Sequence, residues 1–256
     1  MDIVIIGSGN VAAVLGRKFL QAGHRIVQVL SRNASAASEL AYEWDTESAN
    51  YMSLINRQAD IYLIAVSDDA VASVAAELQL PGKVVAHTAA AVPVHVLSQV
   101  TTHYGVFYPL QTLRKESTSL PDIPFYIDGS DAVARQKLHA LAASVMDHQP
   151  ATAGDDQRAR LHVAAVLVNN FVNHLYVLAE EFCQREGIDF KELLPLVNET
   201  AARISQVSPK QAQTGPAIRP DETTLKKHLE ILEAYPALKD IYQQFTDSIQ
   251  RVKYEA

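Results

Sequence analysis

The sequence predicts an α/β protein in two parts, a doubly wound parallel sheet over residues 1–153 and an all-helical domain over residues 154–256. Two observations support this prediction. In the first part, short β-branched runs alternate with segments of helical length, which is typical of successive βαβ units. In the second part the strand pattern stops, and apolar residues recur at steps of three and four, as they do along one face of a helix.

Buried parallel strands are expected where apolar residues run almost without interruption. These segments are residues 2–6, 25–30, 61–66 and 83–87, with two later strands at 105–108 and 125–127. The helices expected between and after them are 11–21, 34–43, 69–78 and 132–145. In the second part, one long helix follows Leu161, and Gly187 is placed to end it. The remaining segments are a helix at 190–204, a loop at 208–221, and helices at 222–234 and 237–252.

Composition excludes several classes of protein. The chain carries 22 Lys and Arg against 29 Asp and Glu, a net charge of −7, and no basic run stands out. Because nucleic-acid binding needs clustered cations, neither nucleic acid nor an anionic membrane is expected as a partner. The single cysteine, Cys183, excludes a disulfide-stabilised secreted scaffold.

The predicted location is the cytoplasm. Residues 1–6 form an apolar strand pattern without the basic start or cleavage site of an export peptide. Residues 161–179 are the best candidate for a membrane span, but polar side chains interrupt them, which disfavours a lipid-exposed helix. These side chains are His162, Asn169, Asn170, Asn173 and His174.

A glycine-rich turn follows the first predicted strand and opens the first helix. Its sequence is Gly7-Ser8-Gly9-Asn10-Val11-Ala12, a G-x-G-x-x-A pattern. The first glycine permits a tight turn, the second lets a diphosphate approach the backbone, and the small last residue allows close helix–strand packing. Because a helix N-terminus presents free N–H groups, we expect this turn to bind a dinucleotide. The alternative is a glycine turn without a ligand.

The end of the second strand indicates which dinucleotide is bound. NAD-binding domains usually place an acidic residue there, whereas this chain has Ser31-Arg32-Asn33. Arg32 can hold a 2′-phosphate in a bidentate pair of charged hydrogen bonds. NADP is therefore favoured over NAD, although Arg32 could also be a solvated loop cation.

Further candidates follow the next strands, because ligands of open α/β sheets bind beyond the carboxyl ends of the strands. Val66 and Ser67 are expected to line the nicotinamide ribose, and Asp68 or Asp69 is expected to cap the next helix. His87 and Thr88 are catalytic candidates that could orient the nicotinamide or polarise a substrate carbonyl. The alternative for His87 is a purely structural histidine.

Substrate-binding candidates come from both parts of the chain. Tyr108 and Gln111 follow a strand and could reach the same crevice, although Tyr108 could equally pack in the core. On the long helix, His162 and Asn170 are catalytic candidates and Asn173 is a substrate-binding candidate. Buried polar groups without partners are costly, so this polar set indicates a cleft or, alternatively, helix–helix hydrogen bonds.

Arg219, in the loop at 208–221, could bind a substrate carboxylate or pair with Asp221. Other chemistries lack their motifs: there is no C-x-x-C, H-E-x-x-H or G-x-S-x-G, and the nine histidines are scattered without metal-ligand spacing. No metal site is expected. Hydride transfer needs no protein nucleophile, because the nicotinamide carries that chemistry.

Several short segments together resemble one known family. They are Gly7-Ser8-Gly9-Asn10-Val11, His87-Thr88-Ala89-Ala90, Tyr108-Pro109-Leu110-Gln111-Thr112, Leu161-His162-Val163-Ala164-Ala165 with Asn170, and Thr214-Gly215-Pro216 with Arg219, Asp221 and His228. The chain resembles the Rossmann-like NADP oxidoreductases that carry a helical C-terminal domain of unknown function. These are relatives of pyrroline-5-carboxylate reductase, the deazaflavin-dependent NADP oxidoreductases and the β-hydroxyacid dehydrogenases. The resemblance implies an N-terminal Rossmann domain and a helical domain similar to that of 6-phosphogluconate dehydrogenase.

The chain departs from these relatives at three places. It has Ala89-Ala90 where the family commonly has Ser-Gly, and Tyr108 where the family often has His. The β-hydroxyacid dehydrogenases carry a catalytic lysine on the long helix, but residues 161–181 contain none, so that mechanism does not transfer.

The main hypothesis is an NADP-dependent oxidoreductase that transfers a hydride between NADP(H) and a small carbonyl or imine substrate. The alternative is a module that binds and senses NADP(H) without catalysis. The helical part is also expected to form a homodimer.

Overall fold

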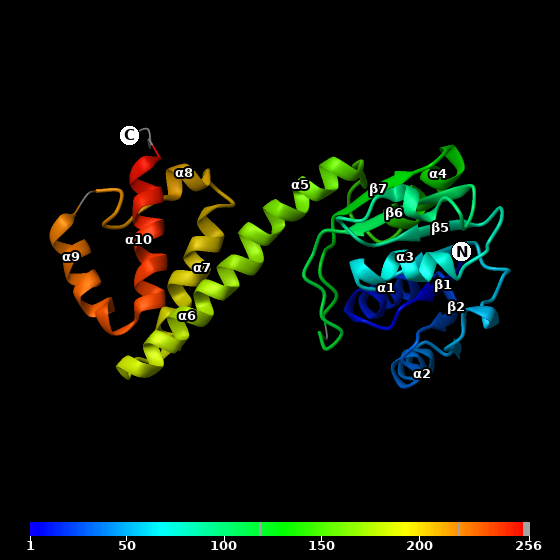
Figure 1. Cartoon of the computed structure of the whole chain (residues 1–256), viewed down its shortest axis with the longest axis horizontal. Helices are drawn as coiled ribbons and strands as arrows, with labels where there is room; N and C mark the ends of the chain where they lie inside the picture. The colour runs from blue at the N-terminus through cyan, green and yellow to red at the C-terminus, as the bar shows by residue number, and fades with distance from the viewer. Residues whose placement is uncertain (118, 220, 253–256) are drawn as a thin grey trace. The chain divides into compact units, whose positions relative to one another are not determined.

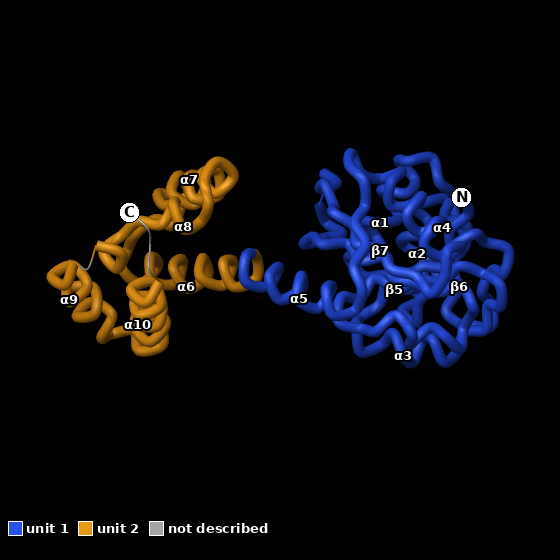
Figure 2. Tube along the Cα trace, turned by 90° about the horizontal axis from the view of Figure 1, so that it is seen from above, with its two compact units in different colours: residues 1–168 blue, residues 169–256 orange. Residues whose placement is uncertain are grey.

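The computed structural model describes residues 1–117, 119–219 and 221–252. The chain divides into two compact units, Met1–Val168 and Asn169–Ala256 (Figures 1 and 2). Their border falls inside a long helix, whereas the sequence-based boundary after residue 153 coincides with the end of the last strand. That boundary stays a prediction.

The first unit is built on one eight-stranded sheet with the order β3-β2-β1-β4-β5-β6-β7-β8. All neighbouring strands are parallel except β6 and β7, which are antiparallel. The strands are β1 (Asp2–Ile6), β2 (Arg25–Leu30), β3 (Glu47–Ala49), β4 (Ile61–Ile64), β5 (Val84–His87), β6 (His103–Pro109), β7 (Phe125–Gly129) and β8 (Ala151–Thr152). The reversal of strand order beside β1 confirms the predicted doubly wound class.

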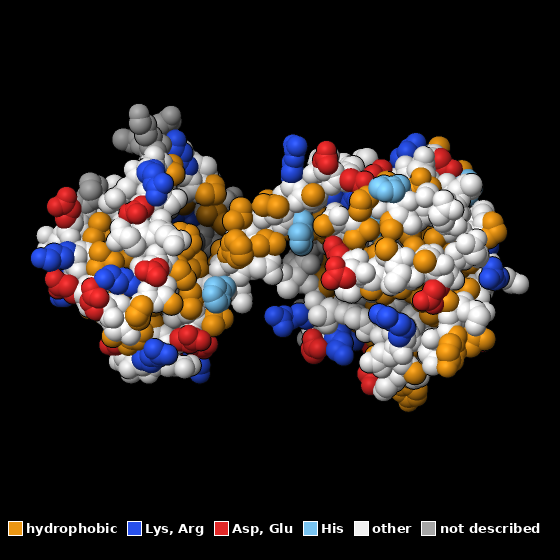
Figure 3. All heavy atoms as spheres, in the orientation of Figure 1, with side chains coloured by type: hydrophobic (Ala, Val, Ile, Leu, Met, Phe, Trp, Pro, Cys, Tyr) orange, Lys and Arg blue, Asp and Glu red, His pale blue; other side chains and the backbone are white. Residues whose placement is uncertain are grey.

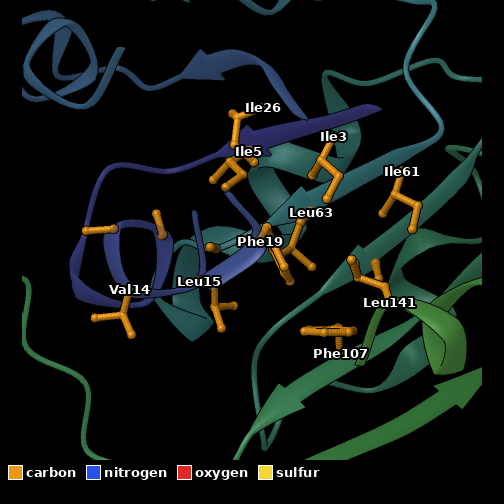
Figure 4. Close-up of a cluster of buried hydrophobic side chains, with 14 of the residues drawn as sticks. Ile3, Ile5, Val14, Leu15, Phe19, Ile26, Ile61, Leu63, Phe107 and Leu141 are labelled. Atoms are coloured by element: carbon orange, nitrogen blue, oxygen red, sulfur yellow. The ribbon is translucent and has the colours of Figure 1, made fainter. Parts of the chain in front are cut away.

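Helices connect the strands of the first unit, and α5 follows the last strand (Figure 1). They are α1 (Asn10–Gln21), α2 (Ala34–Glu43), α3 (Asp68–Ala76), α4 (Ala132–Ala143) and α5 (Asp155–Ala165), with short 3₁₀ turns η1 (Met52–Leu54) and η2 (Val94–Leu97). Alternate residues of a strand point to opposite faces of the sheet, so each face has its own hydrophobic cluster. Ile3 and Ile5 pack with α1, α2 and α4 (Figure 4), whereas Val4 and Ile6 pack with α3.

The second unit is helical throughout its described regular structure, as predicted. Its elements are α6 (Phe171–Glu186), the 3₁₀ turn η4 (Phe190–Leu193), α7 (Leu194–Arg203), α8 (Pro209–Ala212), α9 (Glu222–Ile231), the 3₁₀ turn η5 (Leu232–Ala234) and α10 (Pro236–Arg251). Gly187 ends α6 with φ of +71°, a left-handed conformation that favours glycine. The predicted stop of the long helix is therefore confirmed.

Some local details differ from the sequence-based expectations. The segment 208–221, expected as a loop, contains the short helix α8, which begins with a capping box at Ser208 and Gln211. The expected helix at 190–204 begins as a 3₁₀ turn. Strands β3 and β8 were not expected, because two or three residues are too few to show a strand pattern.

A π-helical turn, η3 (Val166–Asn170), joins α5 to α6. Such turns insert one extra residue into a helix and are frequent at functional sites. Among the described helices, the continuous helix Asp155–Glu186 is the one that is long and apolar enough to span a membrane. Length and composition alone are weak evidence for a membrane span. It holds the polar residues His162, Asn170 and Asn173.

Candidate cofactor and substrate site

A cavity of about 530 Å³ lies where β1, β2 and β4 end. It is lined by Ile6, Gly7, Ser8, Gly9, Asn10, Val11, Leu30, Ser31, Arg32, Asn33, Met52, Ala65, Val66, Ser67, Asp68 and Val74. All nine residues that the sequence predicts to bind the cofactor are among them. The structure thus brings this predicted set together at the edge of the sheet where ligands of open α/β sheets bind. The individual contacts with a cofactor stay predictions.

The absence of a side chain has a different structural consequence at each of the two glycines of the turn. Gly7 donates a hydrogen bond from its N–H to the Leu30 carbonyl (2.8 Å) and has φ of +128°. A Cβ at Gly7 would lie 2.1 Å from the Ala65 carbonyl oxygen, so no larger residue fits. A Cβ at Gly9 would meet no atom within 4 Å, yet Gly9 lines the cavity and is the N-terminal capping residue of α1. Gly7 serves the packing of the strands, whereas Gly9 leaves open space at the N-terminus of a helix.

The end of β2 carries no acidic side chain. The hydroxyls of Ser8 and Ser31 are hydrogen-bonded at 2.8 Å, and the Ser31 hydroxyl accepts the N–H of Asn33 (3.2 Å). Asn33 in turn caps α2 by accepting the N–H of Ala36. These bonds fix the backbone around Arg32, whose exposed guanidinium lines the cavity without an acidic neighbour in the 31–33 turn. An anionic phosphate suits this position better than a ribose hydroxyl.

The start of α3 corrects one expectation. Ser67, not Asp68 or Asp69, is the capping residue of α3, and its side chain makes no capping hydrogen bond. Asp68 and Asp69 lie in the first turn of the helix, where a negative charge is favourable next to the helix dipole. Asp68 also lines the cavity, so the sequence-based cap assignment was wrong and hid a charge at the site.

His87 and Thr88 lie at the end of β5, buried rather than on the cavity wall. His87 is fully buried, and its Nδ1 accepts the N–H of Ala89 (3.2 Å). Burial lowers the pKa of His87 to about 4, and the nearby Arg158 cation adds to this effect. Thr88 donates from its backbone N–H to the Ile64 carbonyl at 3.1 Å. His87 is therefore neutral at neutral pH and supports the backbone that follows β5.

Arg158 is a residue that sequence reasoning missed. Its side chain is fully buried, and Nη2 donates to Asp155 Oδ1 (2.6 Å) and to the Val92 carbonyl (3.0 Å). Asp155 Oδ1 also accepts the N–H of Val94 (3.0 Å), and Asp128 lies 3.6 Å from Arg158 Nη1. The first turns of α5 are thus bonded to the segment that follows His87. The only signal in the sequence is an arginine among acidic residues at a helix start.

Tyr108 and His162 form a polar pair that is not part of the cavity lining. The Tyr108 hydroxyl lies 3.2 Å from His162 Nδ1, and the tyrosine side chain is buried whereas the histidine is exposed. Burial raises the pKa of Tyr108, and the carboxylate of Asp68 raises it further. Tyr108 is therefore protonated and near a residue of the cavity wall. Gln111 donates from Nε2 to the Asp122 carbonyl (3.0 Å) and so closes a loop, and its role in substrate binding stays a prediction.

Three predicted residues belong to the second unit. Asn170, Asn173 and Arg219 are exposed there, and their predicted roles stay predictions. Asp221 caps α9 by accepting the N–H and hydroxyl of Thr224, and these bonds lower its pKa, with a smaller contribution from Arg219. No group of three or more potential metal ligands occurs among the described residues.

Comparisons with known proteins agree with this geometry. Residues 2–91 match the family model described as NADP oxidoreductase, coenzyme F420-dependent, and residues 123–249 match a domain of unknown function, DUF2520. No match was found among the curated proteins.

Solved structures extend the similarity over the whole chain. A Bacteroides fragilis protein described as a putative NADP oxidoreductase is 37% identical, with a TM-score of 0.89 and 98% of each chain covered. Pyrroline-5-carboxylate reductase from Streptococcus pyogenes is 15% identical (TM-score 0.63, covering 98% of this chain and 99% of that one). An imine reductase from Streptomyces aurantiacus is also 15% identical (TM-score 0.69, 98% and 96%).

The two more distant structures share the fold with this chain. The Bacteroides fragilis protein is similar enough, over nearly its full length, to show common family membership. The resemblance inferred from the sequence is confirmed, and with it NADP as the cofactor of the family. The chain belongs to the family of NADP oxidoreductases in which a Rossmann-like NADP-binding domain is followed by a helical DUF2520 domain.

Proposed function

We propose that this protein transfers a hydride between NADP(H) and a small carbonyl or imine substrate. One observation carries the proposal: every residue predicted to bind the cofactor lines one cavity at the edge of the sheet. The fold shared with an imine reductase and with pyrroline-5-carboxylate reductase supports a carbonyl or imine as the substrate class.

The residues present fit NADP. Open space in front of Gly9 leaves room for a diphosphate at the N-terminus of α1, and α1 has no acidic residue in its first turn to repel it. Arg32 would hold the 2′-phosphate, and Val66 and Ser67 would line the nicotinamide ribose. When bound, the coenzyme supplies or accepts the hydride.

Reduction of a carbonyl or imine also requires a proton at the substrate oxygen or nitrogen. Tyr108 and His162 are suited to this task, because the tyrosine hydroxyl is protonated and hydrogen-bonded to an imidazole that is open to solvent. We assign the donated proton to the Tyr108 hydroxyl, with His162 returning a proton to it from water.

The other predicted residues take supporting roles in this proposal. His87 is buried and neutral, so it orients the backbone of Ala89 instead of exchanging protons. Thr88 is buried behind the cavity wall, and its proposed role is to position the ring or the substrate from there. From the helical unit, Asn170 and Asn173 would contact the substrate oxygen or nitrogen, and Arg219 would bind a carboxylate.

An assay with a panel of small ketones, aldehydes and imines tests the proposal through the loss of NADPH absorbance. Replacing Tyr108 by Phe is expected to lower kcat by about a hundredfold or more, the usual contribution of a general acid. Affinity for NADPH should stay unchanged in this variant. Tyr126→Phe is the matched control, since Tyr126 is a neighbouring, half-buried tyrosine of β7. Full turnover by Tyr108→Phe would remove the tyrosine from the mechanism.

The alternative is an NADP(H) sensor without catalysis. It is favoured by the absence of a lysine from residues 161–181. It predicts NADPH binding by the wild type but no oxidation of NADPH with any member of the substrate panel.

We also propose a cytoplasmic homodimer formed through the helical part. The helix from α5 to α6 exposes large apolar side chains, among them Val163, Leu167, Val168 and Phe171 (Figure 3). The polar residues on the same helix suit a second copy of the chain better than lipid. Scattering at increasing concentration should give twice the chain mass, and a monomer at every concentration would contradict this assignment.

A further inference from the structure

The loop between β6 and β7 is held in place at its base. Leu110 donates from its N–H to the Pro124 carbonyl (2.9 Å), and Gln111 donates to the Asp122 carbonyl (3.0 Å). Leu113 is buried within the core cluster that also contains residues of α1. The loop runs beside α1 in Figure 1. The base of the loop is therefore fixed to the first unit by hydrogen bonds and by packing.

Both backbone polar groups of Lys115 are bonded to side chains of α1. The Lys115 N–H donates to Asn10 Oδ1 (3.2 Å), and Arg17 Nη1 donates to the Lys115 carbonyl (2.5 Å). Asn10 and Arg17 are two helical turns apart and so lie on the same face of α1. Arg17 is itself fixed by two hydrogen bonds to Glu43 (2.6 and 2.8 Å). The backbone of Lys115 is thus anchored beside the first turn of α1.

Asn10 links this anchor to the cavity, because it lines the cavity and contacts Lys115. The side chain of Lys115 is exposed and starts next to that wall, on a flexible four-carbon stem. Hydrogen bonds to Glu43 raise the pKa of Arg17, and the negative charge of the adjacent Glu116 adds to this. No ion pair of Lys115 is present within residues 1–117, 119–219 and 221–252.

The charges of the residues that line the cavity indicate a role for the Lys115 ammonium group. Among the residues that line the cavity, Arg32 is the one cation and Asp68 the one anion. NADP carries two negative charges on its diphosphate and about two on its 2′-phosphate. Arg32 is at the end of β2, where the 2′-phosphate is expected, so no cation on the wall is left to balance the charge of the diphosphate at α1.

We propose that Lys115 binds the diphosphate of the coenzyme, with the β6–β7 loop anchored on Asn10 and Arg17 to present it. This inference rests on the proposed function. It adds a binding residue that lies outside the glycine-rich motif and more than a hundred residues from it in sequence.

Calorimetric titration of NADPH and NADH into the wild type, Lys115→Gln and Lys115→Arg tests the inference. Both coenzymes carry the diphosphate, but only NADPH carries the 2′-phosphate. Lys115→Gln should weaken both coenzymes by the same factor, about fivefold to tenfold, and the loss should shrink as salt is added. Lys115→Arg should restore most of the affinity. Lys191→Gln, which removes an exposed lysine of the second unit, is the matched control and should bind as the wild type does.

The outcomes separate this inference from the proposed function. Unchanged affinity in Lys115→Gln, with normal binding by the wild type, overturns the inference alone. A loss confined to NADPH overturns the assignment to the diphosphate. A wild type that binds neither coenzyme overturns the proposed function, and the inference falls with it.

Discussion

Arg158 donates a hydrogen bond from Nη2 to the carbonyl oxygen of Val92, 66 residues earlier in the chain, while its side chain is fully buried. Buried arginines are rare unless their charge is paired, and here Asp155 and Asp128 provide the pairing. The consequence is a fixed connection between the start of the long helix and the segment after His87. Both sides of this connection carry residues assigned to the site.

Replacing Arg158 by Met should destabilise the first unit by about 3 kcal/mol, because two acidic groups lose their partner and two carbonyls lose their donor. Urea denaturation measures this loss. Arg160→Met, two residues away and exposed, should change stability by less than about 0.5 kcal/mol. Equal stability of Arg158→Met and the wild type would show that the buried pairs contribute nothing net.

The pH dependence of stability should contain a contribution from His87. Its pKa is about 4 in the folded protein and near 6.5 in the unfolded chain, so the unfolded state binds the proton more readily. The contribution is therefore complete above pH 6.5 and is lost as the pH falls from about 6.5 to about 4, by on the order of 3 kcal/mol.

Denaturation midpoints measured across that range should show a shallower pH dependence in His87→Gln than in the wild type. His95→Gln removes an exposed histidine from the same segment and serves as the control. Identical slopes for the wild type and His87→Gln would mean that His87 titrates normally in the folded state.

Arg32→Ala should abolish the preference for NADPH over NADH. The guanidinium is placed to bind the 2′-phosphate, and NADH lacks that group, so only NADPH should lose affinity, by about tenfold or more. Titration of both coenzymes into both proteins measures the two ratios. A wild type with equal affinity for NADH and NADPH would contradict the role of Arg32.

Gly7→Ala should fail to fold normally, even though it adds only a methyl group. The new Cβ would lie 2.1 Å from the Ala65 carbonyl, and φ of +128° disfavours any side chain. We expect a loss of at least about 2 kcal/mol, visible as a lower thermal midpoint. Gly23→Ala is a partial control, since Gly23 also has a positive φ of +79° but no neighbour within 4 Å of a Cβ.

The parts of the fold that depend on residues close together in the sequence could be predicted. The buried strands, the G-x-G-x-x-A turn and the helix stop at Gly187 all have local patterns, and the structure confirms them. The prediction that Arg32 binds NADP depended on the absence of an acidic residue at the end of the second strand, which is also a local signal.

Other features could not be predicted because they depend on contacts between distant segments. Arg158 has partners in the loop after β5 and in strand β7, and Lys115 is held by a helix about a hundred residues away. The burial of His87 follows from strands on both sides of β5, so its low pKa had no local signal. Asp68 was misassigned because a residue in the first turn of a helix and a capping residue look alike in sequence.

The central claim is that the backbone around Gly9 binds the diphosphate of NADP, and one pair of titrations tests it most directly. NADPH is titrated into the wild type and into Gly9→Val, whose added side chain meets no protein atom near its Cβ but occupies the space in front of α1. We predict nearly unchanged thermal stability and affinity weakened by more than about tenfold. Equal NADPH affinity in the two folded proteins would contradict the account.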